Sequence, residues 1–263
     1  MLQSCTSAVR RTTHNLNYNL LRSYSSVPST QARLVKQSLR KLLRETAQPV
    51  AVVTSTLPDH ETAPRSDSSM QSQKKAPSIF HGATLSSFTS ISLDPHPLVA
   101  FSLRVPSRMA LALNAHAAKP QMQISSHMVV NILSAAQPHI ARLFSSPDLH
   151  PFPFAESEVQ WTQSADGLPV IKGSLGALSC TVVGRSLPLN DTRWLHSSMK
   201  EWEAEVQQVE GGSGLASELF IARVLRVEDV QEPEGQLENE RLRTLPLLYH
   251  QRAYTTVGKI PNR

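Results

Sequence analysis

Residues 81–107, HGATLSSFTSISLDPHPLVAFSLRVPS, hold the densest group of small hydroxyl-bearing residues in the chain. Across residues 83–93 apolar and hydroxyl side chains alternate imperfectly, which predicts a strand with one buried and one polar face. The prolines within residues 94–97 predict a turn, and the more continuously apolar residues 98–103 predict a second strand. The segment therefore predicts a β-hairpin.

A helix is expected directly after this hairpin. Residues 107–119 carry alanine and leucine at favourable helix positions, and Ser107 is a suitable N-cap. Arg108 stands beside it. Hydroxyl groups, free N–H groups and a helix N-terminus together suit a phosphate, whereas an ordinary exposed strand face is the other interpretation. The hydroxyl side chains brought near the helix would be Thr84, Ser86, Ser87, Thr89 and Ser90.

The order of residues in this segment resembles the opening signature of the flavin reductase-like family, whose members bind FMN on a split β-barrel. Four later segments resemble the family in the same order. They are SLRVPS at 102–107, VVNIL at 129–133, GLPVI at 167–171 and PLLYH at 246–250. With a leading helix the matches span about residues 33–259. The chain is identified as a member of this family, of the fungal mitochondrial type.

The resemblance implies a mainly β fold, an FMN-binding split β-barrel with antiparallel, Greek-key-like strands and peripheral helices. Six or more expected short strands, with short helices between them, also favour a barrel over a parallel sheet. The resemblance further implies a homodimer with the flavin near the dimer interface. In that arrangement Tyr249, His250 and Tyr254 of the closing segment serve either packing at the interface or chemistry.

Site residues follow from the resemblance, position by position. Contacts to the ribityl chain and the flavin ring, partly through the backbone, are assigned to Thr84, Ser86, Ser87 and Phe88. The phosphate is assigned to Ser107 and Arg108, and its approach to Ser102 and Leu103. Arg104 is either a second cation or a solvated residue at a strand end. No catalytic residue is assigned, because hydride transfer between nicotinamide C4 and flavin N5 needs no protein nucleophile.

The first functional hypothesis is an FMN-dependent oxidoreductase of flavin reductase type that uses NADH or NADPH as co-substrate. FMN is preferred to FAD because nothing in the sequence marks an adenosine pocket. The family often has an acidic residue and a histidine near its penultimate strand, where this chain has Ala216 and Ser217. That departure favours the alternative, a non-catalytic flavin carrier or a subunit of a mitochondrial matrix assembly.

Charge is unevenly distributed along the chain. Residues 1–44 contain eight Lys or Arg and no acid, so the net charge of +5 leaves 18 basic against 21 acidic residues afterwards. This distribution argues against nucleic-acid binding by the body. The acid-free, hydroxyl-rich start predicts a transit peptide at residues 1–25 and a mitochondrial matrix location, with a disordered basic tail as the alternative. No apolar run reaches the roughly 18 residues that span a bilayer.

One flavin reductase-like domain is expected at residues 30–260. It would begin with an amphipathic helix at 29–44, for which a longer presequence is the alternative, followed by a strand at 49–55. Two polar stretches, 56–79 and 187–214, are predicted insertions, and the second has a helical pattern over 191–209. The first is expected to be a mobile loop.

Three further residue types could carry chemistry. Cys180 lies in an apolar run and is predicted to be a buried core thiol, and Cys5 would leave with the transit peptide, so no disulfide is expected. The histidines are scattered singly, and no metal site is predicted. Asn131 has two interpretations, an amide that bonds the flavin or its neighbouring backbone and a satisfied residue at the edge of the core.

Overall fold

The computed structural model describes residues 29–57, 79–119, 125–189, 216–234 and 240–258, with side chains from residue 33 onward. The chain divides into two compact units, residues 1–41 and 42–263, and each is treated by itself. Helix α1 spans Ser29–Arg44, as its apolar spacing predicts. The predicted helix at 107–119 is also present, as α2 (Arg108–Ala118), and a further helix, α3, spans Pro138–Ser145.

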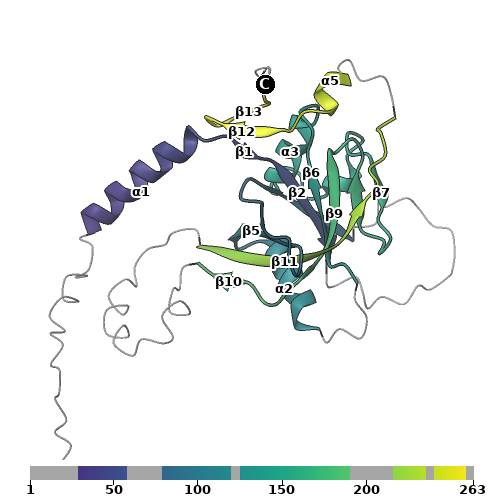
Figure 1. Cartoon of the computed structure of the whole chain (residues 1–263), viewed down its shortest axis with the longest axis horizontal. Helices are drawn as coiled ribbons and strands as arrows, with labels where there is room; N and C mark the ends of the chain where they lie inside the picture. The colour runs from purple at the N-terminus through teal and green to yellow at the C-terminus, as the bar shows by residue number, and fades with distance from the viewer. Residues whose placement is uncertain (1–28, 58–78, 120–124, 190–215, 235–239, 259–263) are drawn as a thin grey trace, which may run out of the picture. The chain divides into compact units, whose positions relative to one another are not determined.

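The main sheet of the second unit is antiparallel throughout and has the order β3-β2-β6-β9-β11-β5-β4, with β10 paired to β11 (Figure 1). Its two edge strands, β3 and β4, are joined by only residues 86–88, so the sheet must curl back on itself into a half-barrel. Its strands are β2 (Ala51–Thr56), β3 (Phe80–Leu85), β4 (Thr89–Ser92), β5 (Leu98–Val105), β6 (Met128–Ile132), β9 (Gly176–Val182), β10 (Leu187–Pro188) and β11 (Ala216–Glu228).

Two smaller sheets and several short helices complete the described structure. The closing segment forms a three-stranded sheet of β1 (Gln48–Pro49), β12 (Leu248–His250) and β13 (Ala253–Thr255). A two-stranded sheet pairs β7 (Trp161–Gln163) with β8 (Pro169–Ile171). The short helices are η3 (Pro153–Ala155) and α5 (Glu240–Arg243).

The prediction of one strand over residues 83–93 was wrong. The stretch is two strands, because β3 pairs with β2 whereas β4 pairs with β5 on the opposite edge of the sheet. At the break, the Ser87 hydroxyl accepts a hydrogen bond from the Ser102 N–H at 2.9 Å and donates to the Ser102 carbonyl at 3.2 Å. A side chain thus replaces backbone pairing where the sheet curls.

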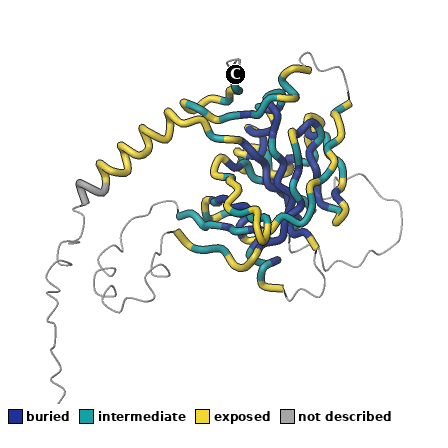
Figure 2. The backbone as a smooth tube through the Cα atoms, viewed as in Figure 1, coloured by how far each residue is buried: buried dark blue, intermediate teal, exposed yellow. Residues whose placement is uncertain are grey.

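Strand β2 is buried on both faces, which explains its continuous apolar sequence. Ala51 and Val53 belong to one hydrophobic cluster with Met109 and Leu113 of α2. The alternate residues Val50 and Val52 belong to a second cluster with residues 140 and 144 of α3. The buried strands therefore lie at the centre of the second unit (Figure 2).

Other predictions are also decided by the structure. Cys180 is fully buried, and burial raises the pKa of its thiol to about 12, which confirms a core thiol. The predicted insertions lie mostly outside the described residues, as does the helical pattern at 191–209. In the described ranges, no helix is long and apolar enough to cross a membrane, and no group of three or more potential metal ligands is found.

Gly82 of β3 allows a close approach that can be tested. A Cβ at this position would lie 2.5 Å from Cδ1 and Cε1 of the buried Phe144 ring. Gly82→Ala is therefore expected to destabilise the protein by about 1–3 kcal/mol, measured by urea unfolding, because the ring must move within a packed core. Gly176→Ala in β9 is the matched control, since its Cβ meets no atom within 4 Å. Equal stability of the two variants would contradict this packing.

Candidate functional site

A cavity of about 1010 Å³ opens along β3 in the second unit. Its volume lies at the upper end of the about 300–1,000 Å³ typical of small-molecule sites. The walls come from β3, the end of β5, the start of α2, the loop after α3, and strands β12 and β13. The proline-containing loop at 147–160 contributes Pro147, Asp148 and Pro151.

The cavity runs beside a strand edge whose backbone groups point away from the sheet. The Leu57 N–H donates to the Ile79 carbonyl at 2.9 Å, and this fixes which residues of β3 bond to β2. By the alternation of antiparallel pairing, Gly82 and Thr84 direct their N–H and C=O groups toward the open edge. β3 has no second strand partner among the described strands. This edge can therefore donate and accept hydrogen bonds with a planar polar ligand.

The structure brings together seven of the eight residues predicted for the site. Those that line the cavity are Thr84, Ser86, Ser87, Ser102, Leu103, Ser107 and Arg108. Phe88 is not among the lining residues, because its side chain packs against the hydrophobic cluster under α2. The roles assigned to these residues stay predictions.

Several of these hydroxyl groups also have structural bonds. The Thr84 hydroxyl donates to the Ala141 carbonyl of α3 at 2.7 Å. Ser107 is the N-cap of α2, as predicted, and its hydroxyl accepts from the Ala110 N–H at 3.3 Å. The remaining N–H groups of the first turn have no acceptor within the helix. Ser107 thus shapes the helix end, and the N–H groups and Arg108 are left to attract an anion.

The charge of the cavity wall favours an anionic ligand. Arg104 and Arg108 line it with one carboxylate, that of Asp148. Both arginines are exposed, and Arg108 donates from Nη2 to the Pro151 carbonyl at 3.3 Å, which ties the start of α2 to the loop after α3. This contact holds one guanidinium at the rim beside Ser107.

His81 also lines the cavity, and the sequence interpretation gave it no role. It is only 5% exposed, and burial followed by the nearby Arg108 charge lowers its pKa to about 4. The imidazole is therefore neutral at physiological pH and able to donate or accept a hydrogen bond. Its position as the first residue of the hydroxyl-rich segment was the only sequence signal available.

Aromatic side chains form another part of the cavity wall. Phe144, Tyr249 and Tyr254 line it, and the two tyrosine rings meet edge to face with centroids 5.5 Å apart. The Arg142 guanidinium carbon lies 5.7 Å from the centre of the Tyr254 ring. Burial raises the pKa of the Tyr254 phenol. Such a wall supplies the apolar surface that a fused ring system needs.

Asn131 does not line this cavity. Its amide is fully buried, where Nδ2 donates to the Val52 carbonyl at 3.2 Å and Oδ1 accepts from the Ile171 N–H at 2.8 Å. The second of its two interpretations, a satisfied core residue, is the one that the structure supports. Its amide joins β6 to β2 and β8.

Ala216 and Ser217 are the first residues of β11, where they pair with Val105 and Arg104. Ser217 lines the cavity. The chain therefore has small side chains at the positions where the resemblance leads one to expect an acidic residue and a histidine.

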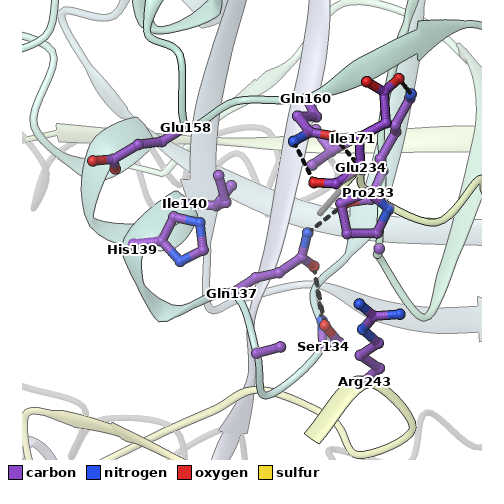
Figure 3. Close-up of a pocket in the computed structure, with 13 residues that line it drawn as sticks. Ser134, Gln137, His139, Ile140, Glu158, Gln160, Ile171, Pro233, Glu234 and Arg243 are labelled. Carbon is purple, nitrogen blue, oxygen red and sulfur yellow. Dashed lines mark hydrogen bonds and ion pairs between the residues drawn. The ribbon is translucent and has the colours of Figure 1, made fainter. Parts of the chain in front are cut away.

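A second, smaller pocket of about 120 Å³ lies between α3, β8 and the segment after β11 (Figure 3). Four of its polar residues bind one another. Gln137 Nε2 donates to the Lys172 carbonyl at 2.8 Å, Lys172 Nζ donates to Glu234 at 3.2 Å, and Gln160 Nε2 donates to the Glu234 carbonyl at 3.1 Å. The larger cavity, with its open strand edge, is therefore the candidate functional site.

A comparison with protein families matches residues 43–258 to the flavin reductase like domain. The chain belongs to this family. The match covers every strand of the main sheet and every wall of the large cavity. Family membership thus confirms the resemblance on which the site residues were assigned.

Curated relatives match over a shorter length. The flavin-dependent monooxygenase reductase subunit HsaB of Mycobacterium tuberculosis is 35% identical over 101 residues, which are 38% of this chain and 46% of that protein. The FMN reductase (NADH) SmoA of Agrobacterium fabrum is 31% identical over 99 residues, covering 38% of this chain and 48% of the relative. The matches thus span about half the length of these relatives.

A solved structure confirms the predicted fold class. Nitrilotriacetate monooxygenase component B homolog from Mycobacterium thermoresistibile superposes with a TM-score of 0.53 at 23% identity, covering 88% of this chain and 93% of the other. At this identity the similarity concerns the fold, a mainly antiparallel sheet curled into a split barrel with few helices.

Proposed function

We propose that the protein is a flavin reductase that binds FMN in the large cavity and reduces it with NADH or NADPH. The observation that carries the proposal is the open edge of β3 beside the start of α2, within a family of flavin reductase-like domains. The names of HsaB and SmoA support flavin reduction, and that of SmoA supports FMN and NADH.

The cavity residues fit the parts of FMN. The Gly82 and Thr84 backbone groups at the open edge suit the hydrogen-bonding edge of the flavin ring, and the aromatic wall suits its apolar edge. Arg108 and the first turn of α2 suit the terminal phosphate. When bound, the flavin supplies the hydride acceptor itself. The protein's task is to orient the two cofactors and to keep water from the reacting faces.

Arg108→Gln tests the phosphate assignment. FMN affinity is expected to fall about fivefold to tenfold, because an exposed charge-assisted contact is lost, and riboflavin affinity should not change. Titration of flavin fluorescence measures both. Arg223→Gln is the control, since Arg223 is exposed on β11 and does not line the cavity. An equal effect on FMN and riboflavin would contradict the assignment. Changing Ser107 as well would confuse the result, because loss of its cap costs about 1 kcal/mol.

A second candidate function is a flavin carrier or an assembly subunit without turnover. It is favoured by Ser217, a small side chain in the cavity wall where a titratable pair was expected. Anaerobic addition of NADH and NADPH to the FMN-loaded protein separates the two functions. Bleaching at catalytic rates supports the reductase, and a bound flavin that stays oxidised supports the carrier. Failure to bind any flavin would contradict both.

The cellular setting also belongs to this proposal. We place the protein in the mitochondrial matrix, as a fungal-type member with a transit peptide at 1–25, a domain at 30–260 and insertions at 56–79 and 187–214. The acid-free basic start supports the targeting. A homodimer is proposed because the resemblance implies one. Imaging of a reporter fused to residues 1–28, and sedimentation of the purified chain, test these two points.

A further inference from the structure

His81 is a polar residue of the large cavity wall that has no part in the FMN contacts described so far. It is only 5% exposed, and within the described ranges no hydrogen bond to its ring is found. The two other buried histidines of the described structure both have such a bond. His116 Nε2 lies 3.3 Å from Thr56 Oγ1, and His127 Nδ1 accepts from the Val182 N–H at 3.3 Å. His81 therefore differs from the histidines that are satisfied by the fold.

A purely structural role would be better filled by an apolar side chain at this position. Burial takes water from the imidazole, and without a replacement hydrogen bond this costs stability. Because side chains alternate along a strand, His81 lies on the same face of β3 as Ala83 and Leu85. Both of these are apolar and pack in the hydrophobic cluster that includes Met109 of α2. A polar ring kept in this row, at the wall of a cavity, points to a bound ligand.

The neighbouring charge indicates which part of a ligand the ring meets. His81 lies on the face of β3 that α2 covers, and Arg108 is the first residue of that helix. The two side chains are close enough that the Arg108 charge adds to burial in lowering the pKa of His81. The neutral imidazole carries one N–H that can donate. Phosphate oxygens only accept, so a phosphate suits this N–H and the guanidinium together.

We propose that His81 donates a hydrogen bond from its imidazole N–H to the phosphate of FMN, beside Arg108 and the first turn of α2. This inference rests on the FMN binding proposed above, and it adds a donor from β3 to those of the helix. The phosphate is then held from two elements of the fold. Riboflavin, which has a hydroxyl group in place of the phosphate, gains nothing from this contact.

Replacement of His81 by an apolar residue of similar size tests the proposal. His81→Leu is expected to lower FMN affinity about tenfold, because a hydrogen bond to a charged group is lost, and to leave riboflavin affinity unchanged. Titration of flavin fluorescence measures both. The urea midpoint of the flavin-free variant at pH 7 should equal or exceed that of the wild type, since leucine needs no hydrogen bond. His139→Leu is the matched control, because His139 is exposed on α3 and does not line the large cavity.

Two further variants separate a direct contact from an indirect one. His81→Gln keeps an N–H donor and should recover part of the FMN affinity that His81→Leu loses. In the background of Arg108→Gln, His81→Leu should still lower FMN affinity severalfold. The absence of any further loss there would mean that His81 acts only by positioning Arg108, and this would overturn the direct contact.

Other results would also overturn the proposal. Unchanged FMN affinity in His81→Leu would remove His81 from the phosphate site. An equal loss for FMN and riboflavin, together with a lower urea midpoint, would show that the imidazole serves the fold. Failure of the wild type to bind either flavin would refute the FMN proposal itself, and this inference with it, so the two failures are told apart by the wild-type titration.

Discussion

Between pH 6.5 and pH 4 the folded protein is expected to lose several kcal/mol of unfolding free energy, because buried histidines stay neutral. Burial and the nearby Arg108 lower the pKa of His81 to about 4. Burial, then the charges of His116 and Lys119, lower the pKa of His127 to about 4 as well. An unfolded histidine takes up a proton near pH 6.5, and one pKa unit corresponds to about 1.4 kcal/mol. Each site can therefore cost on the order of 3 kcal/mol.

The hydrogen bonds of His127 explain why its ring resists a proton. Its Nδ1 accepts from the Val182 N–H at 3.3 Å, and a proton on Nδ1 would meet that donor. The ring also stacks on His116, with centroids 5.2 Å apart, so charging both rings would place like charges together. Burial lowers the pKa of His116 too.

The sign of the effect follows from proton uptake. Above pH 6.5 neither state binds these protons and stability is full. As pH falls the unfolded state binds them first, so stability decreases until the folded pKa near 4. Urea midpoints at stepped pH values measure this. His127→Gln should flatten the decrease, whereas His96→Gln, at an exposed turn, should not. A constant wild-type midpoint from pH 7 to pH 4.5 would refute the prediction.

Asn131→Leu is expected to destabilise the protein by about 2–4 kcal/mol. The Ile171 N–H, buried in β8, would lose its 2.8 Å acceptor, and the Thr54 hydroxyl would lose a neighbour that now donates to it at 3.4 Å. An unsatisfied buried polar group costs about 1–3 kcal/mol. Thr54 also donates to the Pro169 carbonyl at 2.7 Å. Removing the Asn131 amide would therefore disturb the group of hydrogen bonds that joins β2, β6 and β8.

Denaturant unfolding of Asn131→Leu measures this cost. Gln163→Leu provides the comparison, an amide-to-leucine change at an exposed position of β7, for which a change within about 0.5 kcal/mol is expected. If Asn131→Leu kept full stability and instead lost FMN binding, the amide would belong to the flavin site and the core assignment would be wrong.

Local patterns predicted helices and strands where one sequence signal was enough. Ser107 before an alanine-rich run predicted the capped helix α2, and the mostly apolar residues 49–55 predicted a strand, which the structure places at β2 and buries on both faces. The prediction of a single strand over residues 83–93 was wrong because the alternation of apolar and hydroxyl side chains in β3 continues into β4. Which strand each half pairs with depends on partners distant in the sequence.

The residues of the candidate site also fall into those that the sequence predicted and those that only the structure revealed. Hydroxyl residues and Arg108 could be found from their order, because the family signature lies within one segment. His81 could not be assigned, because its burial and the nearby Arg108 charge arise only when β3 and α2 meet. Tyr249 and Tyr254 come from the far end of the chain, and their contribution to the cavity required the closing sheet.

The sequence by itself therefore determined the fold class, the α2 N-terminus, the buried Cys180 and seven residues of the cavity wall. Only the tertiary structure decided that Phe88 packs against the core, that Asn131 binds β2 and β8, and that β3 has an open edge. The physical reason is the distance along the sequence over which each interaction acts. Capping and apolar periodicity act within a few residues, whereas strand pairing and desolvation depend on segments that meet only after the sheet has curled.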